Sequence, residues 1–126
     1  MGLSRSDALS IGRGVGAEAV QGIVTHITGT TPTEVIAGQT GKTLYLNYII
    51  LSTSELNINT FHKLTDGSGG TAFFFEELGN AVYGQGTNIS MNFGEYGLAL
   101  TEDNGLFVES SGVNTDLTVT ALGCWR

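Results

Sequence analysis

The chain has 126 residues with 19 glycines, one proline and one cysteine, and its 12 acidic and 5 basic residues give a formal net charge of −7. Its 40% apolar content excludes a disordered chain, and one cysteine excludes a disulfide scaffold. The acidic balance argues against a nucleic-acid partner, and no apolar run reaches the roughly 20 residues that a membrane span needs, so no membrane partner is expected either.

Residues 1–16 differ in character from the rest of the chain. They are small, polar and punctuated by glycine, and they contain Arg5 and Arg13, two of the five basic residues. With Asp7 this segment has a formal charge of +1, which leaves −8 on residues 17–126. The segment does not contain the apolar stretch that a signal peptide has at its centre. We predict a flexible N-terminal arm over 1–16 and one folded domain over 17–126.

From residue 17 onward, short runs of alternating apolar and polar residues are separated by glycine-rich turns. This period of two is typical of β-strands, and turns recur every 8–12 residues. The pattern predicts an all-β domain, a jelly-roll-like antiparallel β-sandwich of about eight strands. The expected strands cover residues 22–28, 34–37, 42–53, 56–64, 71–78, 88–93, 97–101, 106–110 and 115–124, with a short extra segment at 81–83.

Two local patterns give more specific expectations. In the run 42–53, strict alternation places Leu44, Leu46, Tyr48 and Ile50 on one face of a strand and Tyr45, Ile49 and Leu51 on the other. Asn104-Gly105 is a strong signal for a tight turn. It predicts a hairpin between residues 97–101 and 106–110.

Residues that could carry chemistry are few and scattered. His26 and His62 have no neighbouring ligand at metal-binding spacing, and we expect both on a polar face or a sheet edge. A trimer could still bring three copies of one histidine to a shared axis. Glu76 and Glu77 are adjacent on a predicted strand and therefore point to opposite faces. Cys124 is expected to be a small buried residue of the last strand. The sequence predicts no enzyme, no cofactor and no metal site.

Four stretches together resemble the small jelly-roll virion proteins of tailed phages, which include head decoration (cement) proteins and related fibre modules. They are Gly41-Lys-Thr-Leu-Tyr-Leu-Asn-Tyr-Ile-Ile-Leu-Ser52, Asn92-Phe-Gly-Glu-Tyr-Gly-Leu-Ala-Leu-Thr101, Gly105-Leu-Phe-Val-Glu109 and Asp116-Leu-Thr-Val-Thr-Ala121. The resemblance implies a homotrimer on the surface of a virion capsid, made in the host cytoplasm and bound to the major capsid protein or another virion protein.

The resemblance also implies roles for individual residues. In a decoration protein, the arm would contact the shell through Arg5 and Arg13, which pair with shell carboxylates. In the alternative, a phage fibre or spike module or a lectin-like domain, Tyr83 and Tyr96 would stack on surface glycans. A secreted signalling trimer of jelly-roll type is a third possibility, but residues 1–16 do not have the signal peptide that such a protein is expected to carry.

The low charge content bears on oligomerisation. Sheet edges and apolar faces need charge, proline or a covering partner to prevent unwanted pairing. Only Lys42 and Lys63 are expected to guard strand edges in this way. We therefore expect part of the surface to be covered in an oligomer.

Overall fold

The computed structural model describes residues 17–27, 30–53, 60–78, 87–110 and 117–126. These residues form nine β-strands, and no helix that could cross a membrane occurs among them. The strands are β1 (Glu18–Ile27), β2 (Thr33–Ile36), β3 (Leu44–Thr53), β4 (Thr60–Asp66), β5 (Thr71–Leu78), β6 (Thr87–Asn92), β7 (Leu98–Ala99), β8 (Leu106–Ser110) and β9 (Leu117–Trp125). The predicted arm over residues 1–16 and the predicted segment at 81–83 lie outside the described residues.

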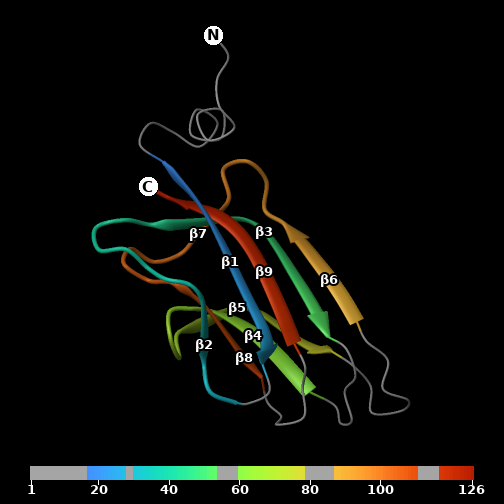
Figure 1. Cartoon of the computed structure of the whole chain (residues 1–126). Coiled ribbons are helices and arrows are strands. Elements are labelled where there is room, and N and C mark those ends of the chain that lie inside the picture. Colours follow the sequence, from blue (N-terminus) through green and yellow to red (C-terminus); the bar gives the residue numbers. More distant parts are fainter. Residues whose placement is uncertain (1–16, 28–29, 54–59, 79–86, 111–116) are drawn as a thin grey trace.

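The strands build two antiparallel sheets that lie face to face (Figure 1). The first sheet has the order β1-β9-β3-β6, with the short β7 added beside β3, and the second has the order β2-β8-β4-β5. Consecutive strands alternate between the sheets, except that β5 follows β4 in the second sheet and β7 follows β6 in the first. A five-stranded and a four-stranded antiparallel sheet wound in this way form a jelly-roll-like sandwich. The predicted fold is confirmed.

The core lies between the sheets and is built by period-two alternation. Leu117, Val119 and Ala121 of β9 are fully buried, and Leu106 and Val108 of β8 meet them from the other sheet. Each buried leucine or valine contributes about 1.5–3 kcal/mol relative to an exposed one. These residues form the hydrophobic core, and Cys124 is buried in β9 as expected.

The predicted faces of β3 are wrong for half of the strand. The register with β9 shifts between Leu46, which lies opposite Gly123, and Tyr48, which lies opposite Leu122. The shift is a bulge at Asn47, where one extra residue reverses the alternation that follows. The inner face consequently carries Leu44, Leu46, Ile49 and Leu51, all fully buried, whereas Tyr45, Tyr48 and Ile50 face outward.

The predicted hairpin around Asn104 is also wrong, although the turn itself is present. The backbone N–H of Asn104 donates to the carbonyl of Thr101 at 3.0 Å, and Asp103 has a left-handed φ of 72°. However, β7 pairs with β3, whereas β8 pairs with β2 and β4 in the other sheet. The turn thus carries the chain from the first sheet to the second. A hairpin with the two-residue β7 would give β8 few backbone hydrogen bonds, whereas β4 pairs with it over five residues.

One glycine in a strand sets how closely the sheets approach at a corner. A Cβ atom on Gly22 of β1 would lie 2.1 Å from the carbonyl oxygen of Val35 in β2. Such a contact is far shorter than van der Waals separation, so only glycine fits. The corner between β1 and β2 is therefore closed by backbone packing.

Candidate interaction surface

The outward side of the first sheet is a surface of uncharged side chains. Directly opposed residues of antiparallel strands point to the same face, so the strand register defines rows across the sheet. The three rows are Ile23–Thr120–Ile50–Ser90, Gln21–Leu122–Tyr48–Asn92 and Thr118–Ser52–Asn88. We call these eleven residues the uncharged face; they lie on β1, β9, β3 and β6, whose arrangement is shown in Figure 1.

The second sheet presents a different outer surface. Glu34 lies opposite Phe107, and Lys63 lies opposite Glu109, with its Nζ 2.8 Å from the Glu109 Oε2. Phe61 also faces outward there, so apolar and charged residues are mixed. Charge is therefore segregated between the two sides of the sandwich.

The apolar part of the uncharged face is exposed on the neighbouring strands β1 and β9. Ile23 is 57% exposed and Leu122 is 40% exposed. They are diagonal neighbours, because Ile23 lies opposite Thr120, two residues before Leu122. Tyr48 and Ile50 continue the apolar strip on β3 and are half-buried. A contiguous exposed apolar patch is typical of a surface that binds another protein.

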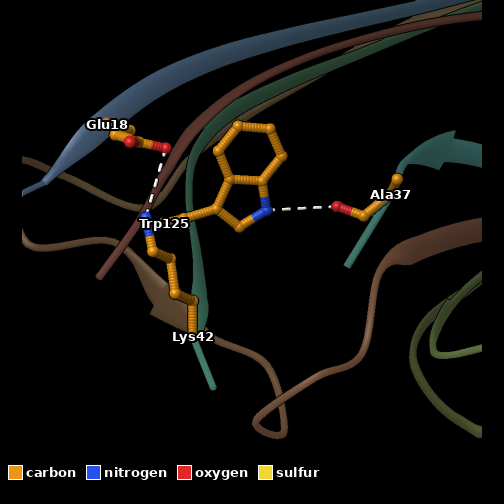
Figure 2. A network of polar contacts seen from close by, with 4 residues as sticks. All are labelled: Glu18, Ala37, Lys42 and Trp125. Atoms are coloured by element: carbon orange, nitrogen blue, oxygen red, sulfur yellow. Dashed lines mark hydrogen bonds and ion pairs between the residues drawn. The ribbon is translucent and has the colours of Figure 1, made fainter. Parts of the chain in front are cut away.

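One end of the sandwich is braced around Trp125. The indole Nε1 of Trp125 donates to the carbonyl of Ala37 at 3.1 Å, which fixes the connection between β2 and β3 (Figure 2). Nearby, the Nζ of Lys42 lies 3.3 Å from the Oε2 of Glu18. Both charged side chains are partly solvated, so this ion pair contributes about 0–1 kcal/mol. Together the contacts hold the start of β1, which residues 1–16 precede.

A second brace at this end centres on Asp66. Its carboxylate accepts hydrogen bonds from the Thr101 backbone N–H at 2.9 Å, the Thr101 hydroxyl at 2.7 Å and the Asn104 Nδ2 at 2.9 Å. Burial by itself raises the pKa of Asp66, but the hydrogen bonds from Thr101 and Asn104 outweigh it, so the pKa is lowered overall. The carboxylate therefore ties the end of β4 to the connection between β7 and β8.

Tyr96 projects from a turn that the bulge residue Asn47 holds in place. The Asn47 Nδ2 donates to the carbonyls of Gly94 at 2.8 Å and Glu95 at 2.9 Å. Gly94 and Gly97 adopt left-handed φ values of 80° and 79°, which glycine tolerates. The Tyr96 side chain is 72% exposed, as a stacking residue requires. The other site residues expected from the sequence, Arg5, Arg13 and Tyr83, lie outside the described residues.

His62 is not on a polar face or an edge, so that expectation is wrong. It is fully buried on the inner face of β4, with its Nδ1 2.8 Å from the Oγ of Ser110 and its Nε2 without a partner. Burial lowers the pKa of His62 to about 4, so the imidazole is neutral. The alternation with buried Leu64 was the sequence signal for this position. Within the described residues, no three metal-ligating side chains come together.

Lys63 does not guard a sheet edge either. It lies on β4, which is flanked by β8 and β5, and Lys42 precedes β3 and pairs with Glu18. The edge strand β6 carries no charged residue in its sequence Thr87–Asn92. In the part of the chain that the structure describes, neither lysine protects the β6 edge beside the uncharged face.

No family model and no curated protein matches the chain. Among solved structures, it is similar to a chain of the cyanophage Pam1 capsid asymmetric unit, with 12% identity, a TM-score of 0.50, and coverage of 87% of this chain and 84% of that one. It also matches a chain of the extra small virus of the giant freshwater prawn Macrobrachium rosenbergii in a virus-like particle (11% identity, 89% and 80% coverage, TM-score 0.39). A third match is to Bacillus endospore appendages, which are disulfide-linked pili (9% identity, 87% and 85% coverage, TM-score 0.42). At 12% identity, the likeness to the phage chain shows a shared fold.

Proposed function

We propose that this protein is a viral structural protein, namely a capsid decoration (cement) protein that binds the outer shell of a phage as a trimer and stabilises it. The observation that carries the proposal is the jelly-roll fold shared with a chain of the Pam1 capsid asymmetric unit. The two chains cover similar fractions of each other, so they are of similar length. A single jelly roll of this size suits an accessory component that sits on a shell.

In this role the protein acts mechanically and uses no catalytic group, cofactor or metal. A stable protein–protein interface buries about 1,200–2,000 Å² in total. Each trimer that bridges neighbouring capsid subunits adds interface that must be broken before the shell opens. The braces at Trp125 and Asp66 serve this role, because a rigid binding end loses little conformational entropy on docking.

The N-terminal arm supplies the second contact. It precedes β1 at the braced end, and its +1 charge contrasts with the −8 of residues 17–126. Arg5 and Arg13 pair with carboxylates of the major capsid protein in the proposed complex, since arginine forms two parallel hydrogen bonds to a carboxylate. The positive charge of the arm thereby reduces the electrostatic repulsion between the acidic domain and carboxylates of the shell.

The test uses virions of the phage that encodes the chain. Mass spectrometry of purified particles should find the protein in stoichiometric amounts, and electron cryomicroscopy should place trimers on the outer shell. Particles stripped of the protein should open at lower temperature and recover on its return. Deletion of residues 1–16 should weaken rebinding, and unchanged rebinding would refute the role of the arm. Absence of the protein from virions would refute the proposed function.

One observation favours the alternative of a fibre, spike or lectin-like module that binds glycans. Tyr96 is 72% exposed on a turn that two side-chain hydrogen bonds from Asn47 hold in place. An exposed ring on a fixed turn stacks on a sugar with little entropy loss. A glycan array with the intact protein and with Tyr96→Ala tests this role; binding that Tyr96→Ala abolishes would favour it over shell decoration. Tyr83→Ala tests the second predicted stacking residue.

A further inference from the structure

We infer that the uncharged face is the surface through which copies of this chain pack against one another, with the β6 edge as its counterpart on the next copy. The inference rests on the trimer of the proposed function and names the residues that form it. It makes no use of shell binding, so the two can be tested apart.

Charge is the first argument for a second copy as the partner. Each chain carries a net charge of −7, so most approaches between two copies bring like charges together. None of the eleven residues of the uncharged face is ionisable near neutral pH. On the other sheet, Glu34 and Glu109 face outward. A basic partner would find no acidic residue on the uncharged face, whereas another copy avoids repulsion there.

The composition of the face is the second argument. Interface centres are depleted in charge and enriched in aromatic and aliphatic residues, with polar residues at the rim. Here Tyr48, Ile50 and Leu122 occupy the middle strands β3 and β9. Charge appears only at the margin, where the Arg126 guanidinium lies 3.9 Å from the centroid of the outward-facing Tyr45 ring. The serine, threonine and asparagine side chains around the apolar centre supply hydrogen-bonding groups for a partner.

The β6 edge is the third argument, and it comes from a different observation. Strand β6 pairs with β3 over six consecutive residues without a register shift, and its sequence TNISMN has no charge or proline. The edge strands β1, β2 and β5 differ, because their pairings each contain a register shift and all three contain glutamate. The remaining edge strand, β7, also lacks charge, but it pairs over only two residues. An edge without bulge, charge or proline invites pairing unless something covers it.

A trimer explains why the face and the edge occur together. The interfaces of a closed three-fold ring are heterologous, so one surface of each copy meets a different surface of the next. The uncharged face and the β6 edge are adjacent in the first sheet, and each fits a partner surface without charge. Packing one against the other buries Ile23 and Leu122 and also protects β6.

The experiment compares matched lysine substitutions on the two sides of the sandwich. Leu122→Lys places a charge on the uncharged face, and Phe61→Lys places one on the second sheet at nearly equal exposure, 40% against 39%. Light scattering and sedimentation equilibrium of the full chain should give a trimer for the wild type and for Phe61→Lys. Leu122→Lys, Ile23→Lys and Ser90→Lys should each weaken assembly at least tenfold.

A milder variant guards against loss of folding. Leu122→Thr keeps a residue suited to a strand and removes apolar area, so it should weaken assembly less than lysine while circular dichroism stays unchanged. A monomeric wild type, or a trimer that Phe61→Lys disrupts and Leu122→Lys leaves intact, would overturn the inference. A trimer sensitive at Leu122 that is absent from virions would leave the inference standing and refute the proposed function.

Discussion

The Nδ1 atom of His62 lies 2.8 Å from the Oγ of Ser110, and both side chains are enclosed between the two sheets. A buried imidazole can satisfy only part of its hydrogen-bonding capacity there, since its Nε2 has no partner. Protonation would place an unpaired charge in the core, which burial strongly disfavours.

The stability of the protein should therefore fall as the pH drops from about 6.5 to about 4. Burial lowers the pKa of His62 from 6.5 to about 4, so in this window the unfolded chain binds a proton that the folded chain does not. Linkage then predicts a loss of up to about 3 kcal/mol in the free energy of unfolding. Urea unfolding at a series of pH values between 7 and 4 measures it.

The matched variant is His62→Leu combined with Ser110→Ala, which removes both polar partners of the buried pair. Its unfolding free energy should be much flatter between pH 6.5 and 5, where carboxylates contribute little. If the double variant loses stability as steeply as the wild type in that range, His62 is not the responsible group.

Removing the carboxylate of Asp66 should loosen the braced end. The Asp66→Ala variant leaves the donors of Thr101 and Asn104 without their acceptor, at a cost of about 1–3 kcal/mol in unfolding free energy. Because the pKa of Asp66 is lowered in the folded state, its contribution is present above the ordinary value of 3.8 and is lost as the pH falls through the folded value. Thermal unfolding at pH 7 measures the first effect.

Glu102→Ala is the control for this prediction, since Glu102 is an exposed acid of the same connection. Its change in unfolding free energy should stay within about 0.5 kcal/mol. Equal effects of the two substitutions would mean that net charge, and not the Asp66 hydrogen bonds, is responsible.

Adding one methyl group at Gly22 should destabilise the corner between β1 and β2. In Gly22→Ala, the new Cβ atom would lie 2.1 Å from the Val35 carbonyl oxygen, so the backbone must shift. Overpacking of this kind costs about 1–3 kcal/mol. Thr25→Ala, at an exposed position of the same strand, should cost clearly less in the same chemical unfolding assay. A neutral Gly22→Ala would show that the two strands separate easily.

Truncating Asn47 should free the turn that carries Tyr96. Asn47→Ala removes the hydrogen bonds to the carbonyls of Gly94 and Glu95, and NMR order parameters for the amides of 94–97 should drop. Asn88→Ala, on the exposed side of β6, should leave these amides unchanged. Rigid amides in Asn47→Ala would mean that the glycine conformations alone fix the turn.

The sequence predicts the fold better than it predicts the surfaces. The bounds of β8 are predicted correctly because Asn104-Gly105 marks the preceding turn and Leu106 to Ser110 alternate regularly. In β3, by contrast, the bulge at Asn47 interrupts the alternation, and no local sequence pattern predicts this bulge. The uncharged face depends on the register between Ile23 and Thr120, which are far apart in the chain. Exposure of Tyr96 was predictable from its glycine-rich turn, but burial of His62 depended on which face of β4 turns inward.

The pairing of the first and last strands makes the domain a natural building block for fusion. Glu18 lies directly opposite Trp125, so the chain enters and leaves the sandwich at the same end (Figure 1). Directly opposed residues of antiparallel strands are about 4.5–5.5 Å apart at Cα, so a few residues would join the two ends and permit circular permutation. A peptide attached after Arg126 would emerge beside the start of β1, at the end that docks on the shell in the proposed function, so such a fusion would compete with docking.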